Sequence, residues 1–300
     1  MDHMRTEFQV DPNAGGFDAS WRRAGWELPA VVVLLLVIVF AAFFVVSNLV
    51  DWVLPTIPMT VDVELGERGW TQLAPPDQRC TDAELMAWVD ALAEPLIAQV
   101  PGDFPPIQYT VIDEEIPNAF ALPGGFLTIH LGLIHQAESA EEVAAVFAHE
   151  IQHAVQRHGT KGILREVGAK TLLGILLGGS SIDLATYRMA NYVALGYSRD
   201  AEREADDLGM AMLEGAGMDP GGLADFFERM EEQEALGIPT WMSTHPDHGE
   251  RSAASRARAD GFSKTFELAA PQDWDCRQAE PSDAEEALTP DGPSAGESMQ

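Results

Sequence analysis

Two histidines four residues apart, with a glutamate directly after the first, stand near the middle of the chain as HEIQH, residues 149–153. On a helix, such histidines lie on one face about one turn apart. Two imidazoles placed in this way can bind one metal ion, and the carboxylate of Glu150 can reach a water on that metal. The alternative is a solvated helix face that carries two ordinary histidines. The sequence around the motif decides between a metal site and a solvated helix face.

A catalytic zinc ion usually has three protein ligands and keeps one position for water. His149 and His153 supply two, and the segment EREAD at 202–206 offers a third. Glu202 and Asp206 are again four residues apart, so one carboxylate can bind the metal while the other accepts a hydrogen bond from a ligating imidazole. Because the chain has 48 acidic residues, this second spacing carries little weight alone.

The segment before the motif predicts a helix that places both histidines at the edge of a buried face. Ser139 and Glu142 have the spacing of a capping box, and the helix should continue to about Arg157. The apolar stripe of this helix comprises Val143, Val146, Phe147, Ala154 and Val155. His149 and His153 border the stripe, as a site recessed in a cleft requires.

These segments together resemble the membrane-associated zinc endopeptidases related to HtpX, the mitochondrial Oma proteases and the CAAX prenyl endopeptidases. The resemblance covers about 107–258 and includes, in the family's order, NAFALPGG (118–125) with FLTIHLGLI after it, HEIQH, SRDAEREAD (198–206) and STHPDHGER (243–251). It implies a gluzincin fold with one zinc ion on His149, His153 and Glu202, and Glu150 as general base. Asp206 would be the hydrogen-bond partner of a ligating histidine. The periplasmic, single-anchor members are the most similar type.

Further site residues follow from the chemistry of peptide hydrolysis and from the resemblance. The developing oxyanion needs a donor, and we expect His245 to supply it, with Tyr197 and Arg251 behind it; a loop that only packs over the cleft is the alternative for His245. The strand that carries Asn118, Ala119 and Phe120 resembles the family's substrate-lining edge, although Asn118 can also simply shape a turn. An extended peptide added to this edge would be held by main-chain hydrogen bonds. We expect no functional role for His130, His135, His158 or His248.

An apolar run precedes the peptidase-like region. No residue from Ala30 to Val46 has a polar side chain, and the run continues with small interruptions to Leu54, which is long enough for a helix across a bilayer core of about 30 Å. A cleaved signal peptide is the alternative, but its apolar region is shorter and is followed by a small-residue cleavage site. Arg22 and Arg23 lie just before the run, and positive charges near one end of a membrane helix favour the cytoplasmic side for that end. These arginines therefore predict a cytoplasmic N-terminus and a periplasmic or extracellular catalytic domain.

The whole chain is predicted to be α+β: a mainly helical metallopeptidase domain with a small β-sheet, preceded by one transmembrane helix. The predicted regions are a cytoplasmic tail (1–28), the transmembrane helix (29–54), a linker with a short strand near 60–65 (55–80), the peptidase domain (81–280) and a disordered acidic tail (281–300). Within the domain we expect a helix over 81–100, capped by Thr81, and strands over 107–113, 119–122 and 126–134.

Composition limits the possible partners. The formal charge of −30 excludes a nucleic-acid-binding surface, because phosphates would be repelled and no basic stripe is present. Cys80 and Cys276 are the only cysteines. They either form one disulfide across the domain in an oxidising compartment or remain two buried thiols.

The first functional hypothesis is a membrane-anchored zinc endopeptidase acting on unfolded or misassembled envelope proteins. A second is a non-proteolytic chaperone or scaffold that keeps the zinc fold, and a third is a soluble protease released by signal cleavage. Glu150 favours an enzyme, because a binding protein could lose this residue without structural cost. Its partners would be protein or peptide substrates and the membrane; the sequence indicates no particular regulatory partner.

Overall fold

The computed structural model describes residues 20–165, 196–235, 241, 245 and 248–276. The chain divides into two compact units, Met1–Val53 and Leu54–Gln300. The predicted acidic tail (281–300), the first part of the predicted cytoplasmic tail (1–19) and the segment 166–195 lie outside the described residues. Most of the loop around His245 does so too.

The first unit contains one helix, α1, which runs over Ser20–Val53. It therefore begins earlier than the predicted start at residue 29. Its described apolar side chains between Val31 and Phe40 are exposed, with relative exposures of 51–70%. Within the part of the chain that the structure describes, no helix has the length and apolarity that crossing a membrane requires.

Residues 55–80 form helices that belong to the second unit. The helix α2 covers Met59–Leu73, between the 3-10 turns Leu54–Thr56 and Pro76–Gln78. The strand predicted near 60–65 was therefore wrong. The buried residues of α2 are Asp62, Leu65, Gly66 and Gly69, which have the spacing of one helical face.

A three-stranded sheet lies at the centre of this unit, in the order β1-β3-β2. Strand β1 (Gln108–Ile112) is parallel to β3 (Phe126–His130), and β2 (Ala119–Leu122) is antiparallel to β3. Gly124 and Gly125 in the turn between β2 and β3 have φ values of 76° and 93°, a conformation that favours glycine. The predicted strand over 126–134 ends at His130, because Leu131–Gln136 form the short helix α4.

Five longer helices lie among the described residues of this unit: α3 (Ala83–Ile97), α5 (Ala140–Val155), α8 (Arg199–Gly215), α9 (Gly222–Ala235) and α10 (His248–Ala259). Asp82, and not Thr81, caps α3, because its side chain accepts the hydrogen bond from the amide of Leu85. The capping box predicted for α5 is present: Ser139 Oγ accepts from the amide of Glu142 and donates to its carboxylate.

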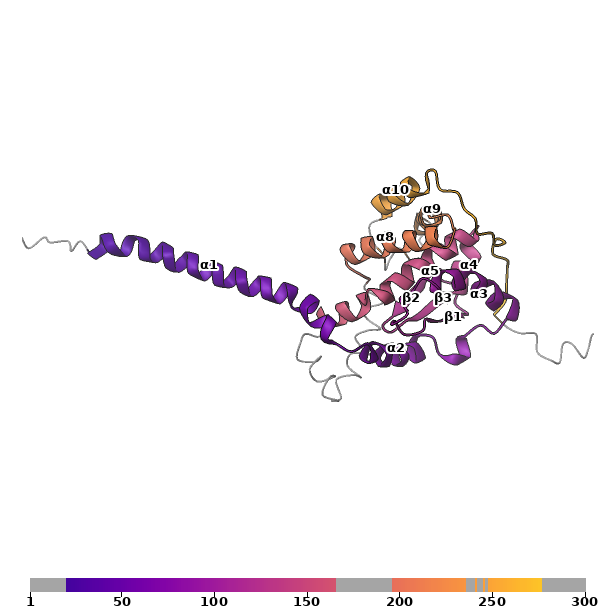
Figure 1. Cartoon of the computed structure of the whole chain (residues 1–300), viewed down its shortest axis with the longest axis horizontal. Helices are drawn as coiled ribbons and strands as arrows, with labels where there is room; N and C mark the ends of the chain where they lie inside the picture. The colour runs from indigo at the N-terminus through magenta and orange to yellow at the C-terminus, as the bar shows by residue number, and fades with distance from the viewer. Residues whose placement is uncertain (1–19, 166–195, 236–240, 242–244, 246–247, 277–300) are drawn as a thin grey trace, which may run out of the picture. The chain divides into compact units, whose positions relative to one another are not determined.

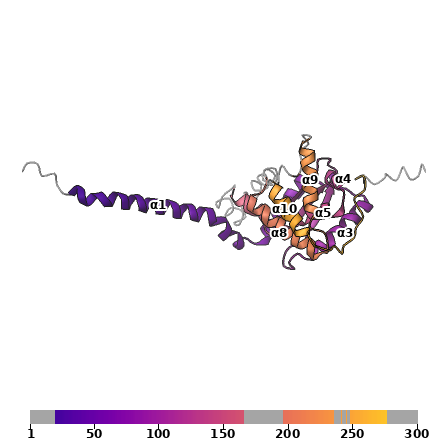
Figure 2. The same ribbon diagram turned by 90° about the horizontal axis from the view of Figure 1, so that it is seen from above.

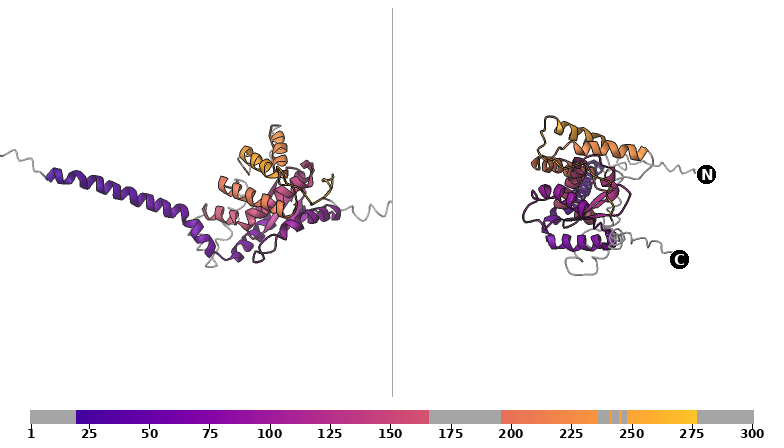
Figure 3. Two further views of the ribbon diagram at one scale, coloured as in Figure 1. Left: turned by 45° about the horizontal axis from the view of Figure 1, so that its top comes forward. Right: turned by 90° about the vertical axis from the view of Figure 1, so that its right-hand side faces the viewer.

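The elements stack in layers, with α2 on one face of the sheet and α5 on the other (Figure 1). Seen from above, α8, α9 and α10 gather around α5 (Figure 2), and the two views in Figure 3 show these later helices on the side of the sheet opposite α2. Side chains of β2 alternate between the two layers. Phe120 and Leu122 pack with Leu65 of α2, whereas Ala119 and Ala121 face the larger core around α5.

A disulfide joins Cys80 to Cys276 and so connects residues 196 positions apart. The backbone supports it on both sides, because the amide of Cys80 donates to Val111 of β1 and the amide of Thr81 donates to Cys276. Of the two alternatives that the sequence leaves open, the structure therefore has the paired one. The segment after α10 is tied back onto the start of the domain.

Candidate active site

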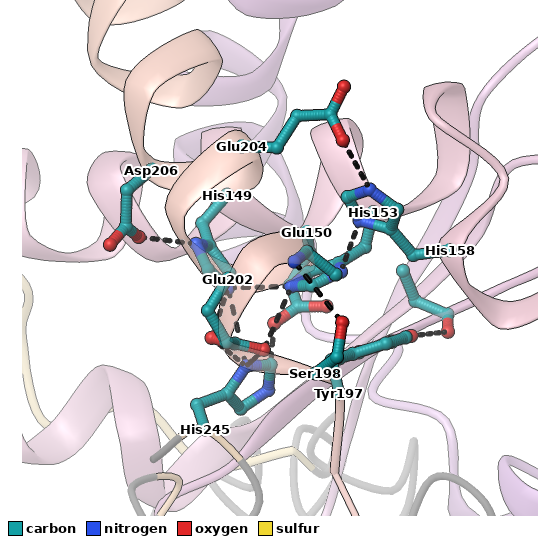
Figure 4. Close-up of polar contacts among 12 residues, drawn as sticks. His149, Glu150, His153, His158, Tyr197, Ser198, Glu202, Glu204, Asp206 and His245 are labelled. Atoms are coloured by element: carbon teal, nitrogen blue, oxygen red, sulfur yellow. Dashed lines mark hydrogen bonds and ion pairs between the residues drawn. The ribbon is translucent and has the colours of Figure 1, made fainter. Parts of the chain in front are cut away.

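The two histidines and the glutamate of the HEIQH motif are buried on α5. His149, Glu150 and His153 are each about 1% exposed. One helical turn separates the two histidines, whose ring centroids are 4.5 Å apart and whose Nε2 atoms are 2.8 Å apart. Both Nε2 atoms thus face the same small space (Figure 4).

Helix α8 brings Glu202 to this space. Its carboxylate oxygens lie 3.5 Å from the Nε2 atoms of His149 and of His153. The approach of the two helices depends on Gly209, because a Cβ there would lie 3.2 Å from the backbone nitrogen of His149. Glu202, which was predicted as the third ligand, therefore lies beside the motif. Gly209, further along the same helix, allows α8 to come close enough to α5 for this.

Asp206 lies one turn after Glu202 and contacts the far side of the His149 ring. His149 Nδ1 is 2.8 Å from Asp206 Oδ1, so the ring donates its Nδ1 hydrogen and its Nε2 lone pair faces inward. Arg251 of α10 donates to both oxygens of Asp206, and its Nη1 lies 2.9 Å from Glu202. The guanidinium therefore fixes both acids of the EREAD segment.

His245 lies beside the same group, although most of the residues near it in the chain are outside the described part. Its Nδ1 is 3.1 Å from Glu202, and its Nε2 is 3.5 Å from Glu150 Oε1. One ligand atom from each of His149, His153, Glu202 and His245 lies within 4.8 Å of the others, which is a geometry able to hold a metal ion. His245 thus lies among the other candidate residues of the site.

Three further aromatic or imidazole side chains contact the site; of these, only Tyr197 was expected there from sequence. Trp241 stacks on His245 with 4.0 Å between ring centroids and donates from its Nε1 to Glu150. Tyr197 stacks on His153 at 3.7 Å and donates from its hydroxyl to the carbonyl of Ala121 in β2. His158 contacts His153 directly. The only sequence signal for His158 was its position shortly after the motif.

Burial and neighbouring charges set the protonation of these groups. Burial lowers the pKa of His153 well below its usual value, and repulsion from His149 and His245 lowers it further. Burial alone raises the pKa of Glu202, but the nearby His245, His149 and Arg251 outweigh it and lower the pKa overall. The site therefore favours neutral His153 and ionised Glu202, the forms in which both can bind a metal.

Two observations test whether a metal ion suits this site. The Nδ1 atoms of His149 and His153 already have partners, so the Nε2 lone pairs, 2.8 Å apart, are directed at one space that a cation would fill. In addition, Glu150 Oε2 is the one buried side-chain oxygen or nitrogen in the described part of the chain without a hydrogen-bond partner. A water on a metal would satisfy it. The donor set of two imidazoles and one carboxylate suits zinc.

The predicted substrate-lining residues lie at the start of β2, an edge strand of the described sheet. The side-chain oxygen of Asn118 accepts a hydrogen bond from the main-chain N–H of Ala119, so the side chain of Asn118 shapes the beginning of the strand. The side chains of Ala119 and Phe120 are buried in the two cores. The side chains of these two residues are therefore not exposed to a substrate.

Comparison with known proteins agrees with this arrangement. Peptidase family M48 matches residues 83–259, a range that contains every element of the site. The mitochondrial metalloendopeptidase OMA1 of Arabidopsis thaliana is 35% identical over 47% of this chain and 29% of its own length. The β-barrel assembly-enhancing protease of Escherichia coli strain K12 is 27% identical over 68% of this chain and 45% of its own length.

The mitochondrial metalloendopeptidase OMA1 of Schizosaccharomyces pombe is 33% identical over 47% of this chain and 43% of its own length. The chain thus spans less than half the length of each of these relatives. The family match nevertheless covers more than half of the chain and includes the HEIQH helix, the EREAD helix and α10. The chain therefore belongs to peptidase family M48.

Proposed function

We propose that this protein is a membrane-anchored zinc endopeptidase that hydrolyses peptide bonds in unfolded or misassembled envelope proteins. The observation that carries the proposal is the convergence of two imidazole lone pairs and the Glu202 carboxylate beside Glu150, whose Oε2 is buried without a partner. Metal ligands and a general base are thereby combined in one buried site.

One zinc ion per chain would be held by His149, His153 and Glu202. When bound, zinc acidifies water and polarises the scissile carbonyl. Asp206 keeps the Nδ1 hydrogen on His149 and so keeps Nε2 available as a ligand. Arg251 holds Asp206 in place through two hydrogen bonds.

Glu150 is the general base in this proposal. Its Oε2 takes a proton from the attacking water as the oxygen adds to the peptide carbonyl. The same carboxyl group then gives the proton to the leaving nitrogen as the C–N bond breaks. Burial raises the pKa of Glu150 more than its contacts with His245 and His149 lower it, and a raised pKa brings the carboxyl closer to the pH at which it must both accept and release a proton.

His245 is proposed to donate to the oxyanion that develops on the substrate. Its Nε2 faces Glu150 at 3.5 Å, so it lies on the side of the site where the base acts. One of its ring nitrogens also lies within 4.8 Å of a potential ligand atom of each of the other three groups, and oxyanion stabilisation requires the substrate carbonyl to come between them. Stacking against Trp241 keeps the imidazole plane fixed.

The substrate is proposed to bind as an added strand along β2 at Asn118, Ala119 and Phe120. Tyr197 connects this strand to the site, because its hydroxyl bonds Ala121 and its ring stacks on His153. Recognition through main-chain hydrogen bonds depends little on sequence, which suits unfolded clients. The named activity of the E. coli relative, β-barrel assembly enhancement, supports a client in the cell envelope.

We further propose that α1 anchors the chain in a membrane, with the N-terminus in the cytoplasm and the peptidase domain in the periplasm or outside the cell. The apolar run from Ala30 to Val46 and the arginines at 22 and 23 support this topology. The disulfide between Cys80 and Cys276 suits an oxidising compartment.

The test uses the full chain purified in detergent. Zinc content is measured, and cleavage of unfolded casein is followed before chelation, after chelation and after zinc is returned. We expect one zinc ion per chain and activity that is lost and restored with it. A protein that binds unfolded casein with its zinc in place but never cuts it would instead be a chaperone or scaffold.

A further inference from the structure

His158 forms a second chain of contacts behind the metal-ligand candidates, on the side away from Asp206. Its Nδ1 lies 2.9 Å from Nδ1 of His153, and its Nε2 lies 3.2 Å from Oε2 of Glu204 (Figure 4). His158 is 2% exposed, whereas the Glu204 side chain is 47% exposed. The contacts therefore run from the exposed Glu204 at the surface, through the buried His158, to His153.

A continuous helix would not allow this contact. Five residues along an α-helix turn the chain by about 500°, which leaves side chains i and i+5 about 140° apart around the axis. Here α5 ends at Val155, and Arg157 adopts a φ of 57°, so the chain turns before the next helical residues begin at 158. The turn brings His158 back over His153.

The Arg157 conformation is costly for a residue other than glycine, and buried contacts hold it. Its guanidinium pairs with the buried Asp62 of α2 and donates to the carbonyl of Leu54 at 3.0 Å. Thr160 donates to the same Asp62. The position of His158 is thus fixed by α2 and not only by its own segment.

The hydrogen atoms along this path can be placed in one consistent way. Glu204 has only acceptor oxygens when ionised, so Nε2 of His158 carries the hydrogen that points to it. Nδ1 of His158 then has a lone pair and accepts the Nδ1 hydrogen of His153. This leaves the Nε2 lone pair of His153 facing Glu202 and His149, which is what a metal ligand requires.

We propose that His158 and Glu204 are positioning residues that fix the tautomer and ring orientation of His153, in the way that Asp206 does for His149. The inference rests on the proposed metal site. It assigns each ligand histidine its own acceptor: Asp206, held by Arg251, for His149, and His158, set by Glu204, for His153. Both acids stand on α8 beside Glu202, so one helix supplies the ligand carboxylate and orients both imidazoles.

The experiment measures zinc affinity of the full chain in detergent by competition with a coloured chelator, which does not depend on proteolysis. We expect His158→Leu to weaken zinc binding roughly tenfold or more, the range typical for partners of ligating histidines. His158→Asn, whose amide oxygen can replace the Nδ1 acceptor, should recover most of the affinity. Glu204→Ala should give a smaller loss, because water can replace a half-exposed acceptor.

Asp200→Ala is the matched control, since Asp200 is an exposed acid on the same helix whose carboxylate pairs with Arg203. It should bind zinc like the wild type. Thermal unfolding of the metal-free variants separates a loss of fold from a loss of affinity. Equal zinc affinity in folded His158→Leu and wild type, or an equal loss in His158→Leu and His158→Asn, would overturn the proposal. Failure of the wild type itself to bind zinc would instead refute the metal site.

Discussion

Trp241 holds one oxygen of Glu150 and leaves the other without a partner. The indole Nε1 donates to Glu150 Oε1 at 3.1 Å, while Oε2 is buried and has no hydrogen-bond partner in the described part of the chain. A carboxylate fixed at one oxygen cannot rotate freely, so the other oxygen keeps a constant direction. This geometry suits a base that must meet a water in one position.

Glu150→Gln should abolish proteolysis while zinc binding and fold persist. The amide keeps the size of the side chain and can still accept from Trp241, but it cannot take a proton. General-base catalysis contributes roughly 10²–10⁴-fold, so casein cleavage should fall by at least two orders of magnitude. Zinc stoichiometry and thermal unfolding are measured on the same preparation. Near-normal turnover in this variant would exclude Glu150 as the base.

Glu202→Ala should weaken zinc binding as severely as His153→Ala, because each variant removes one of three proposed ligands. Asp206→Asn should have a smaller effect, since it alters the partner of a ligand and not a ligand. Chelator competition on the three variants gives this order directly. If Glu202→Ala binds zinc normally, then Glu204 or Asp206 takes its place in the site.

A salt bridge between α8 and α10 gives a prediction for pH. Arg258 Nε and Nη2 lie 2.6 and 2.9 Å from the two oxygens of Glu214, and these hydrogen bonds lower the pKa of Glu214. The stabilisation is therefore complete above the unfolded pKa of about 4.5 and is lost as the pH falls through the lower, folded value.

Glu214→Gln should accordingly lower the melting temperature at pH 7 and have no effect once the pH is below the folded pKa. The pair is partly exposed, so the change in unfolding free energy at pH 7 should be roughly 0.5–1 kcal/mol. Melting curves of both proteins are compared from pH 7 downwards. Adding Arg258→Gln to the variant should lower the melting temperature little further. If the difference in melting temperature between Glu214→Gln and the wild type grew as the pH fell, the lowered pKa of Glu214 would be contradicted.

Alkaline phosphatase fused after the C-terminus tests the topology, because the enzyme becomes active only in an oxidising compartment. We expect phosphatase activity in cells. As a control, Arg22 and Arg23 are replaced by serine and two lysines are inserted after Trp52, which reverses the charge bias around the run. Activity should then fall. An inactive fusion on the original chain, with a fluorescent cytoplasmic reporter active in its place, would reverse the proposed orientation.

The sequence predicted the helix of the motif and its cap because their signals are local. Ser139 and Glu142 lie three residues apart, and the apolar stripe repeats with the helical period, so neither depends on distant residues. The EREAD segment was assigned to the same site through the family resemblance, because the spacing of its two acids carries little weight alone. The structure brings this helix against α5.

Helix α2 was missed because Leu65 is the one large apolar side chain on its buried face. Val61, Val63 and Leu65 alternate as in a strand, whereas the residues that are buried include Asp62, Gly66 and Gly69. The burial of Asp62 depends on Arg157, which is 95 residues away. A pattern based on hydrophobicity cannot contain this information.

His158 and Trp241 were missed for a related reason. The contact of His158 with His153 requires a φ of 57° at Arg157, and arginine gives no sequence signal for that conformation. Trp241 contacts Glu150 from a stretch of sequence that has no apolar periodicity to indicate the direction of a side chain. Both contacts follow from the packing of distant elements and not from the residues next to them.

The bond between Cys80 and Cys276 closes residues 80–276 into a covalent ring. A single cut inside this ring, by a second copy of the enzyme or by another protease, leaves both pieces attached to each other. A nicked molecule would run as one band on a gel without reductant and would separate only after reduction. Residues 54–58, between α1 and α2, lie outside the ring, so a cut there frees α1 and leaves the closed ring whole.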